Sequence, residues 1–197
     1  MSELPMVAIV GRPNVGKSTL LNRIVGRREA IVEEKPGVTR DRKEVEAEWR
    51  GRSFRLVDTG GYMLGGDALD DKVSRQSEKA MKEASAVIVV VDAAVGVTEE
   101  DARVAELLRG VKTPVFIAVN KVDGPNREGA IWEFMALGLG EPSAISALHG
   151  RGTGDLLDRV LDVLPPAEDE DDAVEPEEGR WTHRDDVASV DRGLRLK

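Results

Sequence analysis

The sequence predicts an α/β protein with a mostly parallel mixed sheet that is flanked by helices on both faces. Short apolar runs rich in β-branched residues alternate along the chain with longer stretches of helical spacing, which is typical of βαβ units. Only 4% of the residues are aromatic, so Val, Ile, Leu and Ala must fill the core. With 197 residues, 41% of them hydrophobic, the chain can bury one substantial core, and we expect one globular domain.

The apolar runs predict three central strands, at residues 6–10, 86–91 and 114–119, because nearly continuous apolar runs are typical of strands buried on both faces. Val45, Ala47 and Trp49 alternate with charged residues, and Gly51-Arg52 separates them from the run at 53–58, which predicts an antiparallel hairpin. Helical spacing predicts helices at residues 17–25, 70–84, 99–108, 127–137 and 153–164.

Composition divides the chain into an expected domain at residues 1–166 and an acidic tail at residues 167–197. Pro165-Pro166 ends the last predicted helix, and residues 167–179 carry eight carboxylates and no basic side chain. Such a segment cannot bury enough apolar surface to fold, so it is predicted to be a disordered linker. The whole tail holds eleven acidic and five basic side chains.

Several classes of protein are excluded or disfavoured by composition. The chain has no cysteine, which excludes disulfides and thiolate metal sites and fits a reducing cytosol. No apolar run approaches the roughly 20 residues that span a bilayer, so we expect a cytoplasmic protein without membrane contact. We also expect the isolated chain to be a monomer. The net charge of −9 argues against a strongly basic nucleic-acid binder.

The string GRPNVGKS at residues 11–18 matches G-x-x-x-x-G-K-[ST], directly after a predicted strand and at the start of a predicted helix. Glycines at such positions let the backbone wrap around phosphate groups, with N–H groups and the helix N-terminus facing the negative charge. Lys17 should reach the β- and γ-phosphates, and Ser18 should bind Mg²⁺. The alternative is a glycine-rich turn with an exposed lysine. The predicted phosphate-binding residues are Gly11, Asn14, Val15, Gly16, Lys17, Ser18 and Thr19.

Residues 120–123 read Asn-Lys-Val-Asp and follow a predicted buried strand, which is the N-K-x-D pattern. The carboxylate of Asp123 can accept hydrogen bonds from N1–H and the exocyclic amine of guanine, an edge that adenine does not offer. Asn120 and the stem of Lys121 would hold the base and the loop. Alone, this tetrapeptide would usually be a turn, but its place after the strand predicts a guanine site.

Three further segments complete the predicted site. Asp58 and Gly61, in a D-x-x-G pattern, could hold a Mg²⁺-bound water and meet the γ-phosphate, although this pattern alone is most often an ordinary turn. The Thr39 hydroxyl could complete the Mg²⁺ shell, or Thr39 could be a simple loop residue. Ser146, Ala147 and Leu148 follow a last short strand, and the Ala147 N–H could meet guanine O6. His149 is expected to be merely exposed.

With these five elements in order, the sequence resembles the translation-factor-like GTPases, and longer strings resemble the Der family, also called EngA. The strings are VAIVGRPNVGKSTLLNRIVGRREAIVEEKPGVTRDR, AEWRGRSFRLVDTGG and VNKVD. The resemblance covers residues 6–166 and is closest to the first of that family's two tandem G domains. It implies a P-loop NTPase fold and hydrolysis of GTP to GDP and phosphate, as a switch in assembly of the large ribosomal subunit.

The resemblance also implies features beyond this chain. Der proteins have a second G domain and a KH-like domain, so the chain is expected to be part of a longer protein that contacts the large subunit or its rRNA. Arginines around the predicted nucleotide loops could touch RNA or be solvated; they are Arg12, Arg27, Arg28, Arg40 and Arg42.

One residue departs from the pattern of Ras-type GTPases. The residue after D-x-x-G is Tyr62, where Ras-type enzymes have a glutamine that orients the attacking water. In relatives of this type, an asparagine at the position of Asn14 is thought to bind K⁺, whose charge would substitute for an arginine finger. We adopt this as a hypothesis; the alternative is that Asn14 caps a turn.

The expected mechanism is in-line attack of water on the γ-phosphate, with Lys17, Thr39, Gly61 and Asn14 as the candidate catalytic residues. Loops at residues 27–41 and 62–69 should be ordered with GTP and loosened with GDP. A second interpretation is a regulatory module that exchanges nucleotides and hydrolyses negligibly by itself. A third, an ATP-using P-loop kinase, is disfavoured by Asp123.

Overall fold

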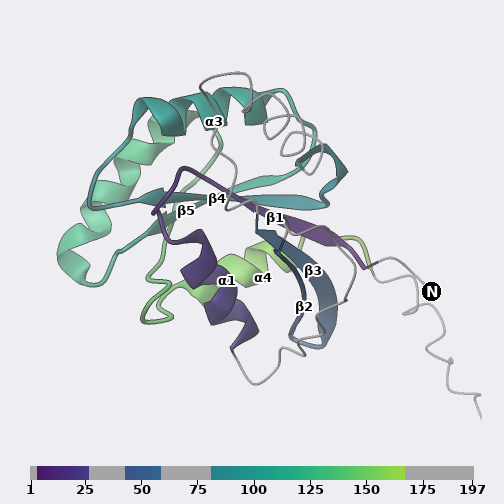
Figure 1. The fold of residues 1–197 in the computed structure, drawn as a ribbon. Helices are drawn as coiled ribbons and strands as arrows, with labels where there is room; N and C mark the ends of the chain where they lie inside the picture. The colour runs from purple at the N-terminus through teal and green to yellow at the C-terminus, as the bar shows by residue number, and fades with distance from the viewer. Residues whose placement is uncertain (1–3, 27–42, 59–80, 167–197) are drawn as a thin grey trace, which may run out of the picture.

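The computed structural model describes residues 4–26, 43–58 and 81–166 (Figure 1). The predicted tail and both predicted switch loops lie outside these residues. The helix predicted at 70–84 lies mostly outside them too, and its described part is helical at residues 81–83.

Six strands form one sheet in the described part of the chain, in the order β2-β3-β1-β4-β5-β6. β2 runs antiparallel to β3, and every other neighbouring pair is parallel, so the predicted mixed sheet is confirmed. The strands are β1 (Met6–Val10), β2 (Lys43–Trp49), β3 (Arg52–Asp58), β4 (Ala86–Asp92), β5 (Val115–Asn120) and β6 (Ser143–Ala144).

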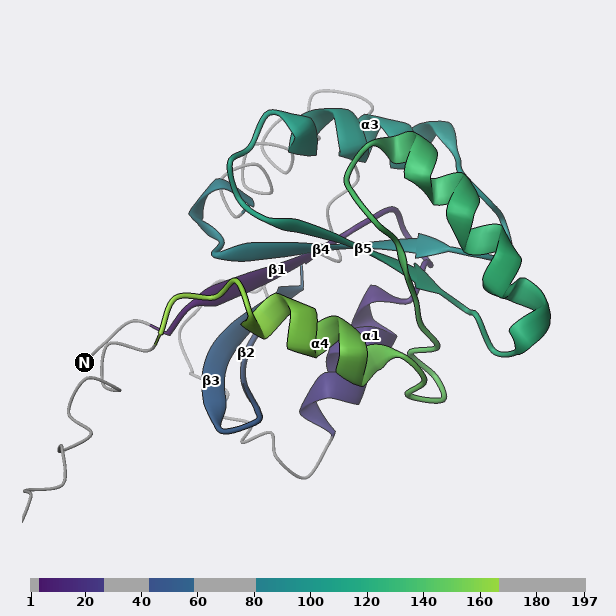
Figure 2. The same cartoon turned by 180° about the vertical axis from the view of Figure 1, so that it is seen from behind.

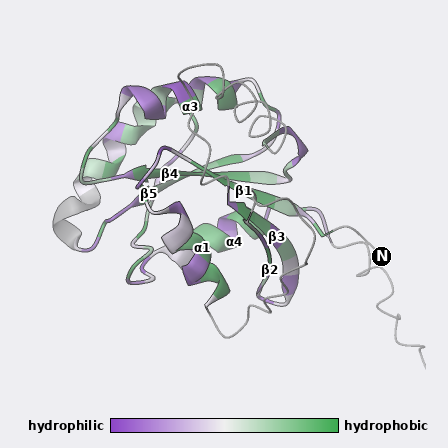
Figure 3. Cartoon of the chain, in the orientation of Figure 1, coloured by the Kyte–Doolittle hydropathy of each residue, from purple (hydrophilic) through white to green (hydrophobic). Residues whose placement is uncertain are grey.

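Helices cover both faces of this sheet. Helices α1 (Lys17–Val25) and α4 (Thr153–Leu161) lie on one face, and α3 (Glu99–Arg109) lies with η1 (Pro125–Leu137) on the other (Figures 1 and 2). Because side chains alternate along a strand, Val7 and Ile9 of β1 pack towards α1 and α4, while Ala8 and Val10 pack towards α3 and η1. Figure 3 shows the strands as mostly hydrophobic between the two helical layers. No helix in the described ranges is long and apolar enough to cross a bilayer.

Two helices differ from their predicted form. Element η1 begins at Pro125 rather than residue 127 and is a 3₁₀ helix, in which residues three apart lie on one face. Ile131, Phe134 and Leu137 are buried, whereas Trp132 and Met135 are exposed. Helix α4 was predicted to run to residue 164 but ends at Leu161, and the next residues form tighter i→i−3 hydrogen bonds.

The hairpin of β2 and β3 is tied to the end of α4. The Trp49 indole N–H donates to Asp158 Oδ1 at 2.7 Å, and Arg50 forms an ion pair with the other oxygen of that carboxylate at 2.7 Å. The Arg52 guanidinium donates to three carbonyls at and beyond the helix C-terminus, those of Leu161, Leu164 and Pro165. The bonds to Leu164 and Pro165 give a donor to carbonyl groups beyond the helix end, where no further helical turn supplies one.

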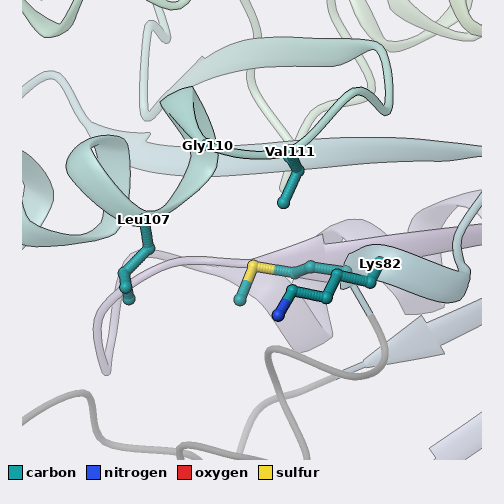
Figure 4. A pocket seen from close by; sticks show the side chains of 5 residues that line it. Lys82, Leu107, Gly110 and Val111 are labelled. Atoms are coloured by element: carbon teal, nitrogen blue, oxygen red, sulfur yellow. The ribbon is translucent and has the colours of Figure 1, made fainter.

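A cavity of about 220 Å³ lies between the C-terminal half of α3 and the helical residues 81–83 (Figure 4). It is lined by Met81, Lys82, Leu107, Gly110 and Val111. No residue of the predicted nucleotide site lines it.

Candidate functional site

The predicted site residues gather where the parallel strands end. Asp58, Asp92 and Asn120 are the last residues of β3, β4 and β5, and the 11–16 loop joins β1 to α1 at the same edge. Asp92 and Asn120 pair across β4 and β5, one residue beyond the predicted strand ends. Ligands of open α/β sheets bind at this edge, so the topology assembles the site from segments far apart in sequence.

At two positions of the 11–16 loop, the backbone conformation and the surrounding atoms leave room only for glycine. Gly11 has φ +144°, and a Cβ there would lie 2.3 Å from the Val90 carbonyl oxygen. Gly16 has φ +100°, and a Cβ there would lie 2.2 Å from Asn120 Nδ2. Asn14 also adopts the left-handed region, with φ 63°. This tightly wound loop before α1 has the form of a phosphate-binding loop.

We expect Gly16→Ala to destabilise the fold by at least about 3 kcal/mol, because it combines a left-handed alanine with displacement of the buried Asn120 amide. The matched control is Gly51→Ala. Gly51 has φ +76° but open space around its Cβ position, so Gly51→Ala should lower the free energy of unfolding by only about 1–2 kcal/mol. Thermal or urea unfolding of both variants measures the difference. Equal destabilisation would show that the contact with Asn120 contributes nothing.

Lys17 is buried beneath the loop, with 6% of its surface exposed. Its Nζ donates to the carbonyl oxygens of Gly11 and Arg12, both at 2.8 Å. Burial lowers the pKa of Lys17, Asp58 acts against this lowering, and the Arg12 charge adds to it. A phosphate group at this position would therefore favour the charged ammonium.

Ser18 and Asp58 form the predicted Mg²⁺ region. Ser18 Oγ donates to Asp58 Oδ2 at 2.9 Å, and Asp58 Oδ1 is buried without a hydrogen-bond partner among the described residues. Such oxygen groups are the ligands that Mg²⁺ prefers, directly or through water, so these residues fit the ion. Thr39 and Gly61, the other residues predicted here, lie outside the described ranges.

Asn120 joins the phosphate loop, residues 11–16, to the segment after β6 at residues 146–149, which we call the base loop. Its Nδ2 donates to the Val15 carbonyl at 2.8 Å, and its Oδ1 accepts from the Ala147 N–H at 2.9 Å. Next to it, Lys121 Nζ lies 2.5 Å from Asp92 Oδ2 and donates to the Asn14 carbonyl at 3.2 Å. Two segments about a hundred residues apart are thus held as one unit.

Asp123 is a half-exposed carboxylate of fixed orientation. Its Oδ1 accepts a 2.7 Å hydrogen bond from the fully buried Ser146 hydroxyl. His149 is exposed, as expected, with Nε2 4.0 Å from the same oxygen. The Ala147 N–H is already bonded to Asn120, so its contact with guanine O6 stays a prediction. Leu148 presents its side chain to solvent, at 64% exposure.

Arg12 is neither solvated nor turned outwards, in contrast to both sequence-based alternatives. Its side chain is 15% exposed, and its Nε lies 3.6 Å from Asp101 Oδ1. The other oxygen of Asp101 accepts from the N–H and hydroxyl of Thr98, which completes the capping box of α3. A Thr-x-x-Asp pattern at 98–101 is a signal for that cap, but nothing in the sequence pairs it with the phosphate loop. The other four arginines of that prediction lie outside the described residues.

A comparison with family models matches residues 6–121 to the model described as 50S ribosome-binding GTPase. The match covers more than half of the chain and contains the phosphate loop, Asp58 and Asn120. The chain belongs to this GTPase family.

GTPase Der of Streptomyces coelicolor is 59% identical over 164 residues, which cover 83% of this chain and 35% of that protein. The resemblance to the first G domain of Der is thereby confirmed. The chain spans about a third of the length of the curated relatives it matches.

Solved structures of Era confirm the fold as that of a P-loop GTPase. An Aquifex aeolicus Era variant bound to GDP and AlF4⁻ has a TM-score of 0.69 at 31% identity, covering 85% of this chain and 59% of that one. Era in complex with MgGDPNP and a segment of 16S ribosomal RNA has a TM-score of 0.69 at 30% identity, covering 91% and 61%.

Proposed function

We propose that this chain binds guanine nucleotides and hydrolyses GTP to GDP and phosphate, as a switch. The observation that carries the proposal is the Asn120 side chain, which bonds to Val15 in the phosphate loop and to Ala147 in the base loop. A nucleotide has its phosphates and its base at opposite ends. A protein that fixes both loops through one buried amide is therefore preorganised for that ligand.

In the proposed reaction, the phosphates lie against the N–H groups of the 11–16 loop and the N-terminus of α1. Lys17 exchanges the carbonyls of Gly11 and Arg12 for phosphate oxygens and stabilises the charge that develops during attack by water. Ser18, Asp58 and Thr39 would hold Mg²⁺, which supplies charge neutralisation between the phosphates. Gly61 would meet the γ-phosphate, and Asp123 would accept from the guanine edge.

We further propose that the longer protein acts in assembly of the large ribosomal subunit, with that subunit or its rRNA as partner. Two findings support this: the family is described by binding to the 50S subunit, and the relatives are GTPases named Der. An Era neighbour was solved with a segment of 16S rRNA, which is RNA of the small subunit and supports only ribosomal RNA as a class of partner. Co-sedimentation of the longer protein with 50S subunits in the presence of GTP or GDP tests the partner. Equal absence from the 50S fraction with both nucleotides would refute it.

Two measurements on this chain test the proposed activity. Calorimetry with GDP and ADP should detect binding of GDP alone, and equal affinities would refute guanine recognition. Single-turnover hydrolysis of GTP should be slow but measurable, on the order of 10⁻⁴ to 10⁻² per second without a partner. The absence of turnover in a chain that binds GTP would favour the regulatory module that exchanges nucleotides without hydrolysing them.

The proposed role of Asn14 predicts a dependence on the monovalent cation. Asn14 lies in the phosphate loop, exposed and with a left-handed backbone, where its side chain could meet a cation beside the phosphates. Turnover should be at least several-fold faster in KCl than in NaCl at equal ionic strength, and Asn14→Ala should abolish the difference. Identical rates in both salts would remove K⁺ from the mechanism.

A further inference from the structure

Arg23 links α1 to the base loop in a way that no motif predicts. Its Nε donates to the Ala147 carbonyl at 2.9 Å, and its Nη2 donates to the Leu148 carbonyl. Arg23 is half-buried and lies in the last turn of the helix that begins with Lys17. One guanidinium therefore holds two successive peptide groups of the segment that follows β6.

The orientation of these carbonyls determines the orientation of the adjoining N–H groups. In a trans peptide the C=O and N–H point in opposite directions. With the Ala147 oxygen held by Arg23, the N–H of Leu148 points to the opposite side of the loop. With the Leu148 oxygen held as well, the N–H of His149 points back and donates to Ser146 Oγ at 3.2 Å.

The two flanking N–H groups are thus occupied, that of Ala147 by Asn120 Oδ1 and that of His149 by Ser146. Among the described residues, the N–H of Leu148 has no hydrogen-bond partner. It is the one donor of this turn that remains available to a ligand beside Asp123. Guanine carries an acceptor, O6, next to the N1–H that Asp123 would bind.

We propose that Arg23 is a positioning residue for guanine recognition: by holding the carbonyls of Ala147 and Leu148, it presents the Leu148 N–H to O6. This inference rests on the proposed guanine-nucleotide function. Arg23 itself does not touch the nucleotide. Its effect should therefore appear in selectivity at one atom of the base, and not as uniform weakening of all nucleotides.

The test compares three diphosphates by calorimetry on the full chain: GDP, 6-thio-GDP and IDP. Sulfur at position 6 is a weak acceptor, so 6-thio-GDP reports on the O6 contact. IDP, inosine diphosphate, lacks the exocyclic amine and therefore reports on the hydrogen bond between that amine and Asp123. Arg23→Ala should narrow the preference for GDP over 6-thio-GDP by about three- to tenfold, the value of one hydrogen bond, and leave the ratio of GDP to IDP unchanged.

Arg109→Ala is the matched control, because Arg109 also lies in the last turn of a helix and donates twice to a backbone carbonyl, that of Leu137, at 3.3 and 3.2 Å. It should leave both ratios unchanged. Arg23→Gln keeps a donor for one carbonyl, so it should narrow the preference for GDP over 6-thio-GDP less than Arg23→Ala does. It replaces the alanine variant if that variant does not fold.

The proposal would be overturned if the Arg23 variants kept the full preference for GDP over 6-thio-GDP. It would also be overturned if they bound all three nucleotides more weakly by the same factor. Failure of the proposed function gives a different result, since the unmodified chain would then show no preference for GDP over ADP.

Discussion

Asp123→Asn is expected to weaken GDP binding by about 10⁴-fold and to create affinity for xanthosine diphosphate. The asparagine amide presents a donor where the guanine amine also presents a donor, so that hydrogen bond is lost and a polar group is left unpaired. Xanthine carries a carbonyl at that position and restores the match. The Ser146 hydroxyl can still donate to the remaining oxygen at position 123, so the loop should keep its geometry.

Competition calorimetry with GDP and xanthosine diphosphate measures this exchange of specificity. Asp162→Asn provides the control, because Asp162 is an exposed carboxylate at the end of α4, away from the base loop. It should leave GDP affinity within a factor of two or so, as expected of a surface substitution. Unchanged GDP binding by the Asp123 variant would place guanine recognition elsewhere.

Lys17→Met is expected to lower single-turnover hydrolysis of GTP by about 10²- to 10³-fold, the usual cost of removing one group that stabilises developing charge. Methionine has a similar length and no charge, so it can occupy the buried position of the Lys17 side chain. The carbonyls of Gly11 and Arg12 lose the Lys17 ammonium group as their hydrogen-bond donor. GTP affinity should fall together with the rate.

The rate is measured with enzyme in excess over labelled GTP, and circular dichroism checks that the variant is folded. Lys112→Met, at an exposed position after α3, removes the same charge without touching the site and should keep the unmodified rate. A Lys17 variant with full activity would exclude this lysine from the reaction.

The sequence predicts the sheet well because central strands carry a strong local signal. Residues 6–10 and 86–91 are continuous apolar runs, and the structure has strands at Met6–Val10 and Ala86–Asp92. The sequence predicts a helix at η1 but not its type, because helical spacing alone does not separate a 3₁₀ helix from an α-helix. Its buried residues Ile131, Phe134 and Leu137 recur at intervals of three, a spacing that also occurs on one face of an α-helix.

The site was predictable as far as its motifs and no further. GRPNVGKS and NKVD each place a loop after a strand, and the structure brings both loops to one edge of the sheet. The residues that hold these loops together carry no such pattern. Arg12, Arg23 and Asp92 each find a partner more than twenty residues away, and these pairings depend on how strands and helices pack.

The bonds from Trp49, Arg50 and Arg52 to α4 have a mechanical consequence. A pulling force applied to the chain at residue 166 meets a helix end that is fastened to a hairpin in the sheet. The load is therefore shared with β3, whose last residue is Asp58, and is not borne by the helix packing alone. Tension applied from that side would therefore reach Asp58, in the predicted Mg²⁺ region, along a single strand.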